Sequence, residues 1–96
     1  QMEYLKNNGY HTISLDMLRD HLKYGTDLPP KSVLITFDDG YQSNYIYAYP
    51  ILKKYDFKAA IFLITRKVKS TPAEFSPAKL TYISRPEIQK SKDVFE

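Results

Sequence analysis

The stretch Val33–Gly40 constrains the fold of this chain more than any other part of the sequence. A run of β-branched and aromatic residues, Val-Leu-Ile-Thr-Phe, ends there in two adjacent carboxylates and a glycine. Such a run is typical of a buried strand, and α/β folds place their functional groups at the carboxyl ends of strands. We therefore expect a strand that brings Asp38 and Asp39 to a functional edge of a sheet, with Gly40 giving the chain room to turn.

The two carboxylates need not share one role. Adjacent side chains on an extended segment point to opposite sides, so one of Asp38 and Asp39 can act as a base while the other binds a cation. A second interpretation involves no chemistry, because Asp and Gly are also the default residues of turns and helix caps. The tripeptide alone leaves both interpretations open.

The residues after this motif predict a helix and a second strand. Pro50 should kink that helix or mark its true beginning. Ala59–Ile64 is a nearly continuous apolar run, which is typical of a strand buried on both faces. Strand, helix and strand predict a parallel βαβ unit around residues 33–64 and an α/β fold class. The inner face of the helix is predicted from side chains at helical spacing: Tyr45, Ala48, Tyr49 and Leu52.

Shorter elements flank this unit. A first helix is expected to end at Asn8-Gly9, followed by a short strand over 10–13. Ser14 can cap a second helix that ends at Tyr24-Gly25, with an inner stripe formed by Leu15, Leu18 and Leu22. Residues 65–81 have little periodicity and predict a loop. Ser84 and Glu87 have the spacing of a capping box at the start of a last helix.

Thr36-Phe37-Asp38-Asp39-Gly40 resembles the first motif of the polysaccharide deacetylases, the NodB-homology or carbohydrate esterase family four group. The resemblance implies the first part of a distorted (β/α) barrel. It extends over most of the chain, through the segments Tyr4–Tyr10, Ile13–Asp16, Leu28–Val33, Tyr49–Tyr55 and Phe57–Ile64.

Roles for the motif residues follow from the resemblance. It implies that Asp38 is the catalytic base and that Asp39 binds a divalent metal, zinc in our expectation, with cobalt or nickel as alternatives. Gly40 is expected to be the structural turn residue. Tyr41 follows directly, and its ring is expected either to border the substrate by stacking on a sugar ring or to pack under the next helix.

The other metal ligands of this family come from a His-[Ser/Thr]-x-x-His motif, which this sequence lacks. Val94-Phe95-Glu96 resembles the start of the strand that carries the first of those histidines. We therefore expect residues 1–96 to be a single incomplete domain whose histidine motif lies beyond the C-terminus. His11 and His21 have no partner at ligand spacing and are not expected to bind the metal.

The resemblance implies a metal-dependent hydrolase that removes N-acetyl groups from an N-acetylglucosamine polysaccharide outside the cell or at its surface. Such an enzyme hydrolyses the C–N bond of an amide, and this amide is not a peptide bond. The alternative is a catalytically inactive deacetylase-like domain that binds carbohydrate. A third interpretation is a phosphoryl-transfer domain. Such domains can use an Asp-x-Asp motif, but the residue two positions before Asp38 is Thr36, so this interpretation is disfavoured.

Composition excludes several kinds of partner and site. Lys and Arg outnumber Asp and Glu by 14 to 11, but they are scattered, so a nucleic-acid partner is not expected. The chain has no cysteine, which excludes disulfides, thiolate metal ligands and a Cys nucleophile. No stretch approaches the ~18 apolar residues of a membrane helix. The sequence does not determine the oligomeric state.

Overall fold

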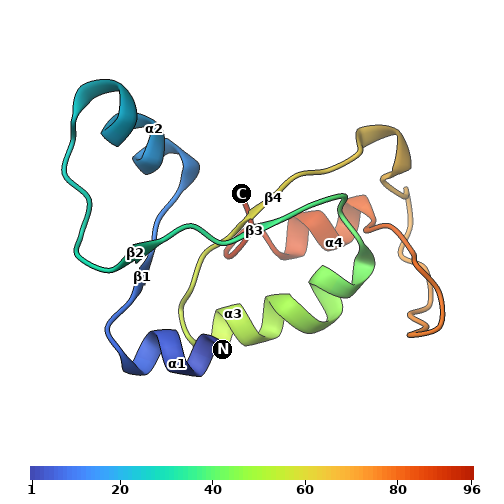
Figure 1. Cartoon of the computed structure of the whole chain (residues 1–96). Coiled ribbons are helices and arrows are strands. Elements are labelled where there is room, and N and C mark those ends of the chain that lie inside the picture. The colour runs from blue at the N-terminus through green and yellow to red at the C-terminus, as the bar shows by residue number, and fades with distance from the viewer.

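The computed structural model describes residues 1–96 as paired parallel strands with helices around them (Figure 1). Strand β1 (His11–Thr12) pairs in parallel with β2 (Ser32–Val33). Strand β3 (Thr36–Phe37) pairs in parallel with β4 (Ala60–Ile61). Parallel strand pairs with helices between the strands confirm the expected α/β class.

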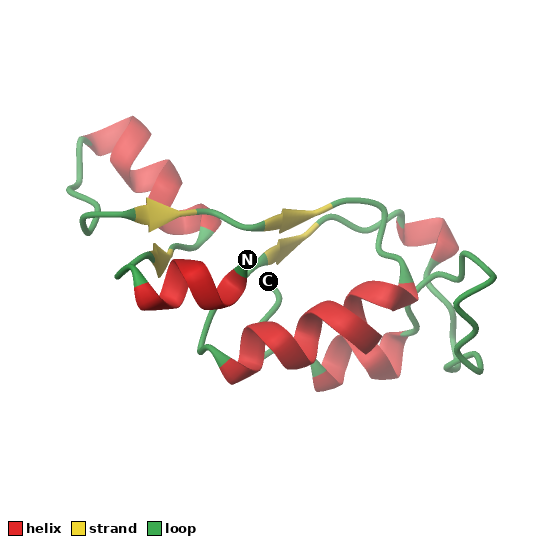
Figure 2. Ribbon diagram, turned by 60° about the horizontal axis from the view of Figure 1, so that its bottom comes forward, coloured by secondary structure: helices red, strands yellow, loops and turns green.

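Strands β2 and β3 follow one another along the chain, so residues 32–37 pair first with β1 and then with β4. Figure 2 shows β2 and β3 one after the other, each with its partner strand beside it, and the helix between β3 and β4 along one side. The Ala60 N–H donates to the Ile35 carbonyl at 2.8 Å, and the Phe62 N–H donates to the Phe37 carbonyl at 2.9 Å. These bonds set the register in which Thr36 lies opposite Ala60. The carboxyl end of β3 is therefore anchored on β4.

The connection from β3 to β4 is helical, which confirms the parallel βαβ unit. A π-helical turn, η1 (Asn44–Ala48), continues into α3 (Tyr49–Lys54). The Tyr49 N–H donates to the Asn44 carbonyl, five residues back. Pro50 lies in the first turn of α3, where its missing N–H leaves no bond unmade. Pro50 thus lies where the π-helical turn passes into α3, within a helical stretch that already begins at Gln42, and it does not mark the true beginning of the helix.

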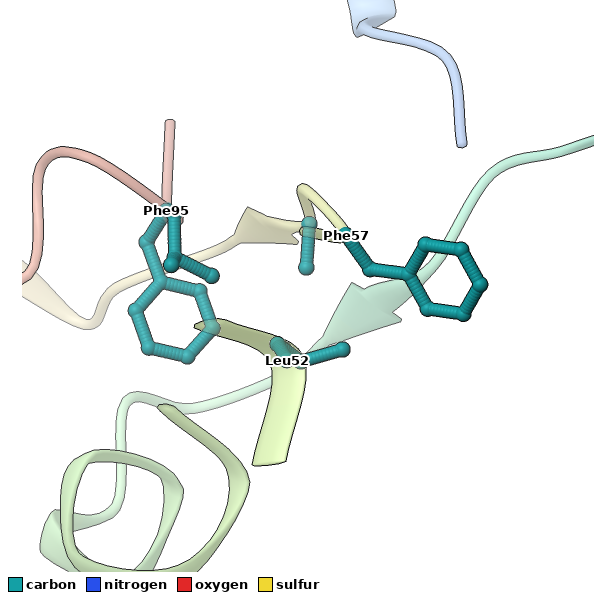
Figure 3. Packing of buried hydrophobic residues seen from close by; sticks show 5 residues of the cluster. Leu52, Phe57 and Phe95 are labelled. Carbon is teal, nitrogen blue, oxygen red and sulfur yellow. The ribbon is translucent and has the colours of Figure 1, made fainter. Parts of the chain in front are cut away.

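A small hydrophobic core fastens this helix to the strands (Figure 3). Leu52 is 1% exposed, which confirms the predicted inner face of α3 at this position. The Phe37 and Phe95 rings meet edge to face, with centroids 5.8 Å apart. The buried members of the cluster are Leu52, Phe57, Ala59, Val94 and Phe95.

The last residues of the chain form a further extended segment beside β4. The Ala59 N–H donates to the Val94 carbonyl at 3.0 Å, and the Ile61 N–H donates to the Glu96 carbonyl at 3.1 Å. Ala59 and Phe95 form a parallel bridge. The expectation that residues 94–96 begin another strand is therefore supported by their backbone pairing.

The first two helices have the predicted ends. Helix α1 (Met2–Asn7) is followed by Gly9 with φ 76°. Helix α2 (Leu15–Tyr24) begins where the Ser14 hydroxyl accepts a hydrogen bond from the Met17 N–H at 3.1 Å.

Two predictions about burial were wrong. Leu22, placed in the inner stripe of α2, is 76% exposed, because this helix stands apart from the remaining elements (Figure 1). Phe62, in the apolar run 59–64, is 49% exposed, because the run is paired and covered only over its first residues. Periodicity identified both elements, but it cannot show whether another element covers each face.

Residues 65–81 contain one 3₁₀ turn, η2 (Thr65–Lys67), and are otherwise loop, as predicted. The last helix, α4 (Arg85–Lys90), has the predicted capping box. The Ser84 hydroxyl accepts a hydrogen bond from the Glu87 N–H at 3.3 Å, and the Glu87 carboxylate accepts one from the Ser84 N–H at 2.9 Å. None of the helices combines the length and the apolar character needed to cross a membrane.

Ser84→Ala is expected to lower the free energy of unfolding by about 1–2 kcal/mol, because it removes a helix cap from a fully buried position. The Ser84 hydroxyl also donates to the Glu87 carboxylate at 2.8 Å, and this bond is lost too. Urea unfolding measures the change. Ser14→Ala removes the cap of the exposed helix α2 and serves as the matched control. A loss at Ser84 no larger than the loss at Ser14 would contradict the prediction.

Candidate active site

The chain turns sharply as soon as β3 ends. Asp38 follows the strand and is exposed, while Asp39 and Gly40 have φ angles of 72° and 71°. Two consecutive positive φ angles reverse the chain sharply, and Asp and Gly tolerate this conformation better than most residues. The argument that Asp38 and Asp39 alternate on an extended segment therefore does not hold, because Asp39 has already left the extended conformation. Their directions are set by the turn.

Gly40 is buried at the centre of this turn. A Cβ atom on Gly40 would lie 2.6 Å from Leu63 Cδ2 and 3.7 Å from Ile83 Cγ2. The position thus favours glycine through its positive φ, and any side chain there would require Leu63 or the turn to move. These two neighbours pack against the turn. Leu63 follows β4, and Ile83 precedes α4.

A segment distant in the sequence holds the turn in place. The Ile83 N–H donates to the Gly40 carbonyl at 2.9 Å, and the Gln42 N–H donates to the Thr81 carbonyl at 2.6 Å. Tyr41 and Tyr82 form an antiparallel bridge between these bonds. Sequence reasoning missed this partner, because the segment follows a long loop and no local pattern links it to the turn.

The Tyr41 ring stacks on the Tyr82 ring, with centroids 5.2 Å apart and planes inclined by 27°. Tyr82 raises the pKa of the Tyr41 phenol above its ordinary value; partial burial and the Asp39 carboxylate act in the same direction. Tyr41 is therefore a neutral phenol at physiological pH, next to the carboxylate-bearing turn. The Lys67 ammonium lies 5.0 Å from the centre of the Tyr82 ring.

Both carboxylates at the turn are exposed, and the three ion pairs of the chain involve other residues. They are accessible oxygen donors of the kind that binds divalent cations. The chain has no group of three or more His, Cys, Asp and Glu side chains that could hold a metal ion. Asp38 and Asp39 therefore fit part of a metal site and do not complete one.

The two histidines lie elsewhere, on β1 and α2, away from the turn (Figure 1). His21 Nδ1 lies 2.8 Å from the Thr26 carbonyl oxygen, which can only accept, so Nδ1 carries the proton. The structure thus brings Asp38, Asp39 and Tyr41 together and keeps the histidines apart from them.

Comparison with known proteins connects this geometry to a family. The sequence model of the family described as polysaccharide deacetylase matches residues 25–83, which include the turn and both strands of the βαβ unit. The chain belongs to the polysaccharide deacetylase family. The expectation drawn from Thr36–Gly40 is thereby confirmed.

Curated relatives agree with this assignment. The chain is 46% identical over 67 residues to a putative polysaccharide deacetylase, YxkH, of Bacillus subtilis, covering 70% of this chain and 24% of that protein. It is 42% identical over 59 residues to the poly-β-1,6-N-acetyl-D-glucosamine N-deacetylase of Escherichia coli K12, covering 62% of this chain and 9% of that protein. The chain thus spans at most about a quarter of the length of these relatives.

Solved structures show that the fold of this chain is that of a deacetylase. IcaB from Ammonifex degensii has a TM-score of 0.76 and 30% identity, over 94% of this chain and 36% of that one. A Streptococcus pyogenes deacetylase, PplD, in complex with acetate has a TM-score of 0.76 and 28% identity, over 99% of this chain and 40% of that one.

Proposed function

We propose that these residues are the segment of a metal-dependent hydrolase that carries its catalytic base and one of its metal ligands. The whole enzyme removes N-acetyl groups from an N-acetylglucosamine polysaccharide. The observation that carries this proposal is the turn after β3, which exposes Asp38 and Asp39 within the region matched by the family. The name of the Escherichia coli relative, a poly-β-1,6-N-acetyl-D-glucosamine N-deacetylase, supports the choice of substrate.

Hydrolysis of an acetamide requires an activated water, polarisation of the carbonyl and an acid for the leaving amine. In our proposal Asp38 accepts the proton of the attacking water, and Asp39 is a ligand of the divalent cation, zinc or alternatively cobalt or nickel. A bound cation of this kind lowers the pKa of water and polarises a carbonyl. The C–N bond breaks, and acetate and a free amine on the sugar result.

Residues outside this sequence complete the site in this proposal, because a catalytic zinc site takes three protein ligands and none of the histidines here lies at the turn. The same residues complete the (β/α) barrel. The substrate is a polymer, and we place the enzyme outside the cell or at its surface, where such polysaccharides accumulate.

The proposed function is tested by acetate release from β-1,6-linked N-acetylglucosamine oligomers by the full-length protein that contains this chain. The protein is stripped with a chelator and then reloaded with zinc. We expect one divalent ion per chain and activity that returns with the metal. Oligomer binding by a protein that holds no metal and releases no acetate would instead support the alternative, an inactive carbohydrate-binding domain.

The 96-residue chain alone is expected to bind zinc only weakly and to release no acetate. One or two carboxylates with water cannot match the affinity of a three-ligand site. Isothermal titration calorimetry with zinc measures the affinity directly. Sub-micromolar binding by this chain would contradict the prediction and would show that it contains a complete site.

A further inference from the structure

A pocket of about 200 Å³ opens beside the turn, between the residues that follow Gly40 and the loop before α4. Tyr41 contributes to its wall, and the exposed Asp39 lies two residues before Tyr41 along the chain. Its volume is below the range of about 300–1,000 Å³ typical of drug-sized ligands. The pocket is thus suited to a single ring and not to an oligomer.

A buried amide, that of Gln42, is among the polar groups that line this pocket. Gln42 is 2% exposed, and its Nε2 donates to the Ala73 carbonyl at 2.7 Å and to the Glu87 carboxylate at 3.1 Å. Both partners only accept, so the orientation of the amide is determined. Gln42 Oε1 is buried and has no hydrogen-bond partner. A buried acceptor without a partner is costly, and a donor on a ligand would relieve that cost.

The walls of the pocket are aromatic and nearly uncharged. The Tyr47 side chain is 54% exposed and lines the pocket. The Tyr47 and Phe75 rings are perpendicular to one another, with centroids 5.3 Å apart and planes at 85°. Lys79 is the one charged residue among those lining the pocket. Such walls favour a neutral ligand that has both an apolar face and hydroxyl groups.

We propose that this pocket binds one neutral pyranose ring of the glycan, in the position next to the sugar that loses its acetyl group. The Tyr47 ring contacts the apolar face of the pyranose, and Gln42 Oε1 accepts a hydrogen bond from one of its hydroxyl or amide groups. This assignment rests on the proposed function, and it predicts that the enzyme recognises at least two consecutive sugars of the polymer.

The test compares three variants of the zinc-loaded full-length protein, with a β-1,6-linked N-acetylglucosamine pentamer as the probe. Tyr47→Ala removes the ring and is expected to raise KM by about tenfold while kcat changes less than about twofold. Tyr47→Phe keeps the ring and is expected to retain the wild-type KM. Tyr24→Ala removes another exposed tyrosine, 68% exposed, from the distant helix α2 and is the matched control.

A wild-type KM in Tyr47→Ala would overturn the assignment, and so would a KM in Tyr47→Phe raised as far as in Tyr47→Ala. If the wild-type protein releases no acetate, the proposed function fails, and calorimetric titration with the same pentamer then decides the role of the pocket. Pentamer binding that is weakened by Tyr47→Ala and kept by Tyr47→Phe would support the pocket. Equal binding of the pentamer by the wild type, Tyr47→Ala and Tyr47→Phe would overturn the assignment of the pocket.

Discussion

In the full-length protein, Asp38→Asn is expected to retain the metal and to lose about 100- to 10,000-fold in turnover, the usual contribution of a general base. Asparagine keeps the size and shape of the side chain but cannot accept the proton of water at neutral pH. Asp39→Ala is expected to lose the metal and the activity together, because it removes a ligand. Metal content per chain and acetate release, measured on the same preparations, separate the two roles.

Asp39→Ala also places alanine at a φ of 72°, which strains the backbone whether or not a metal is present. Asp56→Ala is the matched control, because Asp56 has a φ of 55° and lies in the turn between α3 and β4. We expect similar losses in thermal midpoint for both variants and a loss of metal only for Asp39→Ala. If Asp38→Asn empties the site, the two roles are reversed. If neither Asp38→Asn nor Asp39→Ala changes metal content or acetate release, both carboxylates are residues of an ordinary turn.

The βαβ unit could be predicted from the sequence because its signals are local. The apolar run before Asp38, the helical spacing up to Leu52 and the second apolar run each lie within a short window. Capping is equally local, and both Ser14 and Ser84 form the expected cap hydrogen bonds.

Contacts between distant segments could not be predicted in the same way. The pairing of Tyr41 with Tyr82 has no sequence signature, because a long loop separates them. The positive φ of Asp39 and the exposure of Tyr47 depend on how that loop and its partner pack around the turn. The metal role of Asp39 stays a prediction, since it came from the family resemblance and depends on ligands that this chain does not contain.

Gly40→Ala is expected to lower acetate release by about a hundredfold, because a displacement of about 1 Å at catalytic groups has effects of this size. The new Cβ would lie 2.6 Å from Leu63 Cδ2, so either Leu63 rotates or the turn moves and carries Asp39 with it. Gly25→Ala is the matched control, because Gly25 has the same φ of 71° and a Cβ there meets no atom within 4 Å. It measures the cost of the backbone conformation alone, about 1–2 kcal/mol.

The comparison of these two glycines separates a catalytic role of the turn from a structural one. If the position of the carboxylates matters, Gly40→Ala loses far more activity than its thermal midpoint suggests, while Gly25→Ala loses a similar amount of stability and keeps its turnover. Rotation of Leu63 alone would absorb the contact and leave activity near that of the wild type. Near-normal turnover in folded Gly40→Ala would therefore show that Gly40 is an ordinary turn residue, and the roles of Asp38 and Asp39 would then rest on their own variants alone.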